Sequence, residues 1–253
     1  MKKMLEGALG LLLVIGCSSP TTVTETVECK WQFVDRREYR YEFTEEIHRR
    51  SGRATGKVAT GDIAKVITKR GTVKVLCGKV MAKVSLSYEK SGAEAAPFLR
   101  TEQCIAPTGA VIVPEKGPAV RNDLLFPIPG RPLLPGEVLK QEMVVAESGA
   151  PPLCGTGEFS YVGREAVDGM PCIQYQVSAD LRFDPKPKDR DPKTVEMRAD
   201  MNVLFAVDRG CCVSVEGVTR KRVSRALKGL SEAEQGKATL EQETRRIKLR
   251  LVQ

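Results

Sequence analysis

The stretch IQYQVSADLRF, residues 173–183, alternates between apolar and polar side chains at every position. Its odd positions, from Ile173 to Phe183, are apolar, and its even positions are Gln, Ser, Asp or Arg. Successive side chains of a β-strand point to opposite faces, so this pattern indicates a strand with one buried face and one face in water. A sheet covered on one face only is typically antiparallel.

The same period of two recurs along the chain, at 79–89, at 195–207 and, in shorter form, at 247–251. In the first of these segments the apolar face starts at Val80 and ends at Tyr88. We therefore predict an all-β fold, an antiparallel meander that forms a curved sheet, a half-barrel or a sandwich. Helix-forming residues within Ser224–Gln242 allow one short helix near the C-terminus.

Turn residues separate the predicted strands. Asp168-Gly169 is typical of a tight hairpin turn, and Asp208-Arg209-Gly210 predicts a second reversal. Arg70-Gly71 is expected to interrupt an earlier strand. The charged, proline-rich segment 184–193 is expected to be a loop, because proline cannot donate to the hydrogen-bond ladder of a sheet.

Seven prolines fall within 107–136, and this change of composition divides the chain. The segment is either a long ordered crossing or a linker between two β subdomains. Both alternatives place one β-rich region over residues 29–253, with or without a division near 107–136.

The N-terminus has the layout of an export signal. Met1–Lys3 is positively charged, and the apolar run Ala8–Ile15 follows it. A helix needs about 20 residues to span the hydrocarbon core of a bilayer, so this run is too short to be a transmembrane anchor.

Val14-Ile15-Gly16-Cys17 resembles the lipobox of bacterial lipoproteins. The resemblance implies that residues 1–16 are removed by cleavage between Gly16 and Cys17. It also implies that the Cys17 sulfur carries a diacylglyceryl group and that the new N-terminus is acylated, for example with palmitate. These acyl chains would hold the protein on a membrane of the cell envelope.

Residues 17–28 are then expected to be the lipidated cysteine and a flexible tether, because Ser18–Glu28 is polar and lacks apolar periodicity. Ser18 rather than Asp after the cysteine favours the outer membrane, with the domain facing the periplasm or the surface.

Three further segments resemble a group of uncharacterised all-β bacterial lipoproteins. They are WQFVDRREYRYEF (31–43), LLPGE (133–137) and YVGREAVDGMPC (161–172), the last followed by LFAVDRG (204–210). This resemblance implies a fold rather than an activity.

Seven cysteines remain once Cys17 is assigned to lipid. Export to an oxidising compartment makes disulfides the default, and neighbouring strands would bring Cys172 within reach of Cys211 or Cys212. The sequence has no C-x-x-C motif, and adjacent cysteines are poor ligands for one tetrahedral zinc, so we expect no metal site and no cofactor.

The chain has one histidine, His48, which limits acid–base and nucleophilic catalysis. On a strand, Glu46 and His48 share a face while Glu45 points away from it, and Arg49 and Arg50 follow, so we expect an exposed, charged strand end here. The sequence also lacks G-x-S-x-G, H-E-x-x-H and phosphate-binding glycine loops. We therefore predict no catalytic residues and no enzyme; a catalytic site built from other groups is the third hypothesis.

Positive charge gathers at the C-terminus. From Thr219 onward ten basic residues stand against four acidic ones. The residues that could contact an anionic surface are Arg220, Arg222, Arg246, Lys248 and Arg250. We expect no nucleic-acid binding, because these cations are not interleaved with aromatic residues.

Two functions follow from these features. The first is a lipid-anchored, non-enzymatic binding or structural β module, in one version a carrier of lipid or another hydrophobic ligand on its concave face. The second is a scaffolding or partner-binding protein that uses the basic C-terminal surface on anionic envelope components or on an envelope protein.

Overall fold

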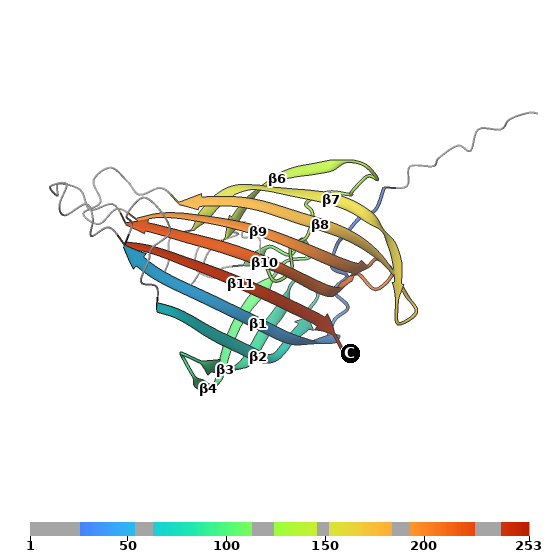
Figure 1. Ribbon diagram of the computed structural model, residues 1–253. Helices are drawn as coiled ribbons and strands as arrows, with labels where there is room; N and C mark the ends of the chain where they lie inside the picture. Colours follow the sequence, from blue (N-terminus) through green and yellow to red (C-terminus); the bar gives the residue numbers. More distant parts are fainter. Residues whose placement is uncertain are drawn as a thin grey trace, which may run out of the picture.

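The computed structural model describes residues 26–53, 63–112, 124–145, 152–183, 193–225 and 239–252. They form one antiparallel sheet of eleven strands (Figure 1). The strands are β1 (Glu38–Arg53), β2 (Ile63–Cys77), β3 (Ala82–Gly92), β4 (Ala96–Ile105), β5 (Val111–Ile112), β6 (Val138–Val145), β7 (Leu153–Val167), β8 (Met170–Phe183), β9 (Lys193–Ala206), β10 (Cys211–Arg225) and β11 (Thr239–Leu251). The predicted all-β, antiparallel fold is confirmed.

The described residues contain no helix. Of the segment that could form a short one, Ser224 and Arg225 end β10 and residues 239–242 begin β11. The remainder of that segment, and residues 184–192 of the predicted proline-rich loop, lie outside the described residues.

The sheet consists of two meanders joined by the first and last strands. Its order is β5-β4-β3-β2-β1-β11-β10-β9-β8-β7-β6, so every strand except β1 and β11 pairs only with its neighbours in sequence. The β1–β11 register runs from Tyr41 opposite Leu251 to Arg53 opposite Thr239. Strands on both sides of residues 107–136 therefore belong to a single sheet.

Local sequence accounts for most of the strand pattern. In β8 the side chains of Ile173, Tyr175 and Val177 are buried, while the polar residues between them face outward. Asp168 and Gly169 join β7 to β8 with φ angles of 50° and 74°, the left-handed pair that a tight hairpin turn requires. The predicted reversal before Cys211 is also present, with Gly210 at a φ of 56°.

Two local expectations are wrong. Arg70-Gly71 does not interrupt a strand, because β2 continues through it. A Cβ at Gly71 would lie 2.0 Å from the Ser87 carbonyl oxygen and 2.6 Å from the Cα of Tyr88, so glycine is needed here for close packing rather than for a turn. Val80 does not belong to a buried strand face: it precedes β3 and is 71% exposed.

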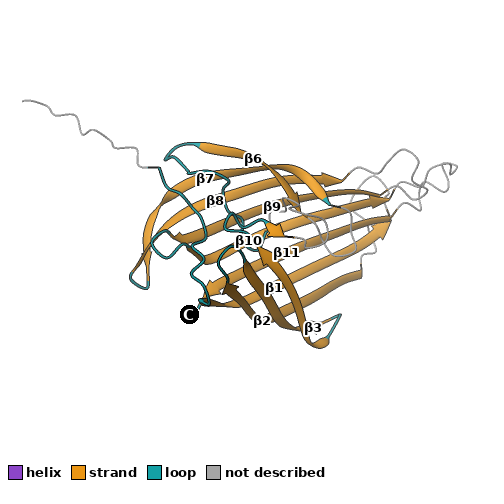
Figure 2. Cartoon of the chain, turned by 180° about the vertical axis from the view of Figure 1, so that it is seen from behind, coloured by secondary structure: helices purple, strands orange, loops and turns teal. Residues whose placement is uncertain are grey.

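The sheet curls, and two segments without strands lie inside the curl (Figure 2). We call the inner side the concave face. Residues 26–37 and 124–137 pack against it and bury their apolar side chains, which include Val27, Trp31, Phe126, Ile128 and Leu133. The proline-rich segment is thus an ordered crossing over its described part, because its Ile128 and Leu133 are core residues.

Aromatic packing joins these two segments to each other and to the sheet. The Trp31 and Phe126 rings meet edge to face with centroids 5.3 Å apart, and Phe126 also contacts the Tyr41 ring of β1 at 5.5 Å. The Tyr175 hydroxyl donates a hydrogen bond of 2.8 Å to the Pro127 carbonyl oxygen. One part of the concave face is therefore sealed by the chain itself.

We predict that Phe126→Ala lowers the free energy of unfolding by about 3–5 kcal/mol, because it removes a ring that is 1% exposed and leaves a cavity between Trp31 and Tyr41. Urea denaturation followed by circular dichroism measures this change. The matched control is Phe98→Ala on β4, where the ring is 67% exposed and the expected change is within about 0.5 kcal/mol. Equal effects of the two substitutions would contradict the assignment of residues 124–137 to the core.

Candidate functional site

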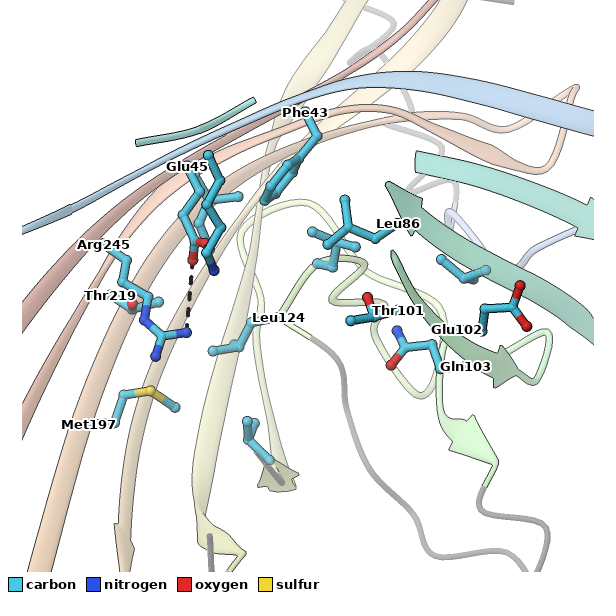
Figure 3. A pocket seen from close by; sticks show the side chains of 15 residues that line it. Phe43, Glu45, Leu86, Thr101, Glu102, Gln103, Leu124, Met197, Thr219 and Arg245 are labelled. Carbon is cyan, nitrogen blue, oxygen red and sulfur yellow. Dashed lines mark hydrogen bonds and ion pairs between the residues drawn. The ribbon is translucent and has the colours of Figure 1, made fainter. Parts of the chain in front are cut away.

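Beside the sealed part, the concave face carries an open cavity of about 270 Å³ (Figure 3). Both meanders contribute to it: Phe43 of β1 and Leu86 of β3 on one flank, Met197 of β9 and Ile247 of β11 on the other. Leu124, at the start of the described crossing segment, also lines it. Figure 3 shows Phe43, Leu86, Leu124 and Met197 around the same space. The cavity thus lies over the junction of the two meanders.

A buried carboxylate lies in the wall of this cavity. Glu45 is 4% exposed and accepts a hydrogen bond from the Lys69 ammonium group of β2. A guanidinium nitrogen of Arg245 lies 3.8 Å from the other Glu45 oxygen. Lys69 also lies over the Tyr88 ring, with its nitrogen 5.3 Å from the ring centroid. Two cations therefore compensate the charge of one carboxylate that would otherwise be costly to bury.

The ion pairs continue away from the cavity toward the far end of β1. Arg245 pairs with Glu243, and Glu243 accepts a hydrogen bond of 2.5 Å from Arg49. Arg49 also donates to Glu94, in the turn between β3 and β4, at 2.6 Å. We call the six residues Lys69, Glu45, Arg245, Glu243, Arg49 and Glu94 the ion-pair ladder.

The cations of the ladder control the ionisation of Glu243. Burial by itself raises the pKa of this carboxyl group, but the charges and hydrogen bonds of Arg245 and Arg49 outweigh burial and the pKa is lowered. Burial also opposes the charge of Arg49, yet Glu243 and Glu94 together raise the pKa of Arg49. Both side chains are therefore charged at neutral pH.

A second hollow, of about 420 Å³, adjoins the ladder. We call it the basic recess. Five cations line it, Arg49, Arg50, Lys65, Lys221 and Arg245, against three carboxylates, Glu94, Glu241 and Glu243. Arg245 lines both the cavity and the basic recess, so the two hollows share one side chain.

A third hollow lies at the rim of the sheet rather than on the concave face. It measures about 750 Å³ and separates residues 26–32 from the β7–β8 hairpin. Its lining mixes charged side chains, such as Lys30 and Glu165, with the apolar residues Val27, Ala166, Pro171, Cys172, Ile173 and Val207. It contains no aromatic side chain among the described residues.

The sequence interpretation missed the residues of the ladder. Glu46 and His48 were expected on one strand face and Glu45 on the other, all at an exposed strand end. The opposite faces are confirmed, and Glu46 and His48 form a half-exposed pair with side chains 2.5 Å apart. The expected exposure is wrong for Glu45, which points inward and is buried. The signal was present, because Glu45 follows Tyr41 and Phe43 at a spacing of two and therefore shares their inward face.

The three cysteines predicted to pair are free thiols in the structure. Cys172 of β8 and Cys211 of β10 both lie opposite Ala206 of β9, so one strand separates them. Two strand spacings amount to roughly 10 Å between Cα atoms, whereas a disulfide needs about 4.4–6.8 Å. The pairing of Cys172 with Cys211 or Cys212 stays a prediction, and it requires movement of these strand ends.

Burial lowers the reactivity of the cysteine thiols in the core. It raises the pKa of Cys211 to about 11 and the pKa of Cys29 to about 12. The thiolate is the nucleophilic form of cysteine, so these side chains are poor nucleophiles at neutral pH. Within the described ranges, no group of three or more His, Cys, Asp or Glu side chains is placed to hold a metal ion.

The predicted basic surface lies on the convex face of β10 and β11, and carboxylates are interleaved with it. Arg220 pairs with Asp200 at 2.9 Å, and Lys248 pairs with Glu216 at 2.7 Å. Arg246 and Arg250 lie 3.9 Å from Glu46 and Asp168, respectively. Arg222 shares this face but lies in a shallow hollow beside Asp180, Glu196 and Arg198. The structure brings these cations onto one face together with acidic neighbours.

Gly16 and Cys17 lie outside the described residues. Across the ranges that are described, there is no helix with the length and apolar character needed to cross a membrane.

We predict that Glu243→Gln destabilises the protein by about 1–3 kcal/mol at pH 7, because Arg49 and Arg245 lose a charged acceptor. A carboxyl group with a lowered pKa in the folded state contributes stability above its unfolded value, near 4.5, and loses it as the pH falls further. The difference between wild type and variant should therefore shrink below pH 4.5. Urea denaturation at pH values from 7 to 3 measures it.

The control for this substitution is Glu216→Gln, which removes an exposed ion pair with Lys248 on the convex face and should change stability by less than about 1 kcal/mol at every pH. A Glu243→Gln variant as stable as wild type at pH 7 would show that the ladder does not stabilise the fold.

Comparison with known proteins identifies no family. No family model matches the chain, and no curated protein matches it. Among solved structures, the secretin XcpQ from Pseudomonas aeruginosa aligns with 87% of this chain and 59% of its own, at 10% sequence identity and a TM-score of 0.13. The chain thus spans less than two thirds of that protein, and a similarity this low identifies neither a fold relative nor a function.

Proposed function

We propose that this protein is a lipid-anchored component of the bacterial cell envelope. Its β domain would be a non-enzymatic module that binds a hydrophobic ligand in the cavity of the concave face. The anchor is supported by the sequence, in which a short apolar run ends at Gly16-Cys17. The ligand is supported by the cavity itself.

The observation that carries the ligand is that the described residues do not fill the concave face completely. Residues 26–37 and 124–137 seal one part with Trp31 and Phe126, and the described part of the chain leaves a cavity next to Leu124. Leu86, Leu125 and Ile247 line it and are only partly buried. Removal of apolar surface from water is worth about 25 cal/mol per Å², so a ligand that covered these side chains would gain free energy.

The size of the cavity limits the ligand. Its 270 Å³ is slightly below the roughly 300–1,000 Å³ typical of small-molecule pockets. A slender group such as part of an acyl chain suits this volume better than a polycyclic molecule. Because Arg245 lines both hollows, a longer ligand in the cavity would reach the basic recess past this side chain.

The alternative function is a scaffold that uses Arg220, Arg222, Arg246, Lys248 and Arg250 on an anionic envelope surface. Acidic neighbours on the convex face reduce the net charge of this region, since Arg220 and Lys248 have ion-pair partners within 3 Å. Exposed ion pairs of this kind contribute little energy and are screened by salt. We therefore rank this function below ligand binding.

The anchor predicts that Cys17→Ala abolishes membrane attachment. Wild-type protein expressed in a bacterial host should partition into the detergent phase and carry the mass of its acyl chains. The variant lacks the sulfur that accepts the diacylglyceryl group, so it should partition into the aqueous phase without that mass. A variant that still enters the detergent phase, together with a parent protein that carries no acyl mass, would refute the anchor.

Ligand binding predicts that a neutral apolar fluorophore, N-phenyl-1-naphthylamine, binds the protein and that Leu86→Trp weakens this binding at least about tenfold by filling the cavity. A chain of residues 18–253 suffices for this titration, because all described packing lies within residues 26–252.

The matched control is Leu76→Trp on β2, a leucine that is 46% exposed and does not line the cavity. It should bind the fluorophore as wild type does. Circular dichroism verifies that both variants fold. Absence of binding, or equal binding by both variants and wild type, would refute a ligand in this cavity.

A further inference from the structure

The concave face is apolar at one end of the strands and charged at the other. On β1 the inward side chains are Tyr41 at the sealed part, Phe43 and Glu45 in the cavity wall, the buried Ile47, and finally Arg49 toward the strand end. The register continues this arrangement on the neighbouring strands. Phe43 lies opposite Leu249, while Arg49 lies opposite both Glu243 of β11 and Lys65 of β2. The charged ends of these three strands therefore lie side by side.

Most of the charge at this level is balanced within the ladder. The ladder contains three cations and three carboxylates, each in contact with a neighbour of opposite sign. Outside the ladder, the described lining of the basic recess adds Arg50, Lys65 and Lys221 and one carboxylate, Glu241. Among the described residues the recess lining therefore has two more cations than carboxylates, next to the apolar cavity.

From this arrangement we propose that the cavity and the basic recess together bind one anionic amphiphile. Its acyl chain would lie against Phe43, Leu86 and Met197, and its carboxylate or phosphate group would lie in the recess near Lys65 and Lys221. This inference rests on the proposed function, since it identifies the chemical class of the ligand for the same cavity.

The position of Arg245 supports a single ligand rather than two separate ones. Arg245 lines both hollows, so the cavity and the basic recess adjoin at this side chain, and one elongated molecule would be long enough to contact both. The apolar side chains of Phe43, Leu86 and Met197 support one orientation, because an acyl chain gains free energy by covering them and an anionic group does not.

Electrostatics predicts a measurable preference for anions. A hollow with protein walls of low polarisability strengthens the attraction between the cations and an anionic group relative to open water. A neutral amphiphile with the same chain gains only the apolar contacts. Added salt should weaken the binding of the anion and leave that of the neutral molecule unchanged.

The test is displacement of N-phenyl-1-naphthylamine from residues 18–253 by dodecanoate, dodecyl phosphate and dodecanol, each below the concentration at which it forms micelles. At least one of the two anions should displace the fluorophore at about tenfold lower concentration than dodecanol, and this advantage should shrink in 0.5 M salt. Preference for dodecanoate would identify a carboxylate head group, and preference for dodecyl phosphate a phosphate head group.

A double variant locates the head group. Lys65→Glu with Lys221→Glu should raise the concentration of anion needed by about tenfold and leave dodecanol unchanged, because the apolar wall is intact. The matched control is Arg70→Glu with Lys74→Glu, the same charge change at exposed positions of β2 that line neither hollow. All three compounds should displace the fluorophore from the control variant at the same concentrations as from wild type.

The outcomes separate the two claims. If the anions and dodecanol compete equally in wild type at low and high salt, the anionic head group is refuted while the hydrophobic cavity stands. The same holds if the double variant behaves like its control. If the fluorophore does not bind wild type at all, the proposed function itself fails. If the double variant does not fold, the salt dependence of anion binding by wild type still tests whether the ligand has an anionic head group.

Discussion

Pairing between the first strand and the last holds the two meanders together as one sheet. β1 and β11 align over thirteen residue pairs, and without them residues 38–112 and 138–251 would form two separate sheets. The pairing also builds the candidate site, because Glu45 of β1 and Arg245 of β11 lie two positions apart in this register. A contact between the two ends of the chain therefore creates both the single sheet and its buried charges.

The position of this pair explains how the concave face is filled. Because β1 and β11 are central, β5 and β6 become the two edges of the sheet, and the chain between them has to cross from one edge to the other. The described part of that crossing buries Phe126 and Ile128 against the sheet, where Trp31 of the N-terminal segment meets it. These two segments cover part of the concave face, and Leu124, the first described residue of the crossing, lines the cavity beside them.

Much of the sheet follows from local sequence. The alternation at 173–183 predicts β8 and its buried face, and Asp168-Gly169 predicts the turn before it, because both patterns act between residues that are close in the chain. The failures have a different physical origin. Gly71 looks like an interruption until Tyr88 of the next strand is placed against it, and Glu45 looks exposed until Lys69 and Arg245 are placed beside it. Partners from other strands decide these positions, and no local pattern contains them.

A crystal structure with dodecanoate carrying bromine on its terminal carbon would show whether an anionic amphiphile binds in the cavity of the concave face. We expect an anomalous bromine peak between Phe43, Leu124 and Met197, with the carboxylate near Lys65 and Lys221. A bromine peak in the hollow between residues 26–32 and the β7–β8 hairpin, or no peak at saturating ligand, would show that the amphiphile does not bind in this cavity.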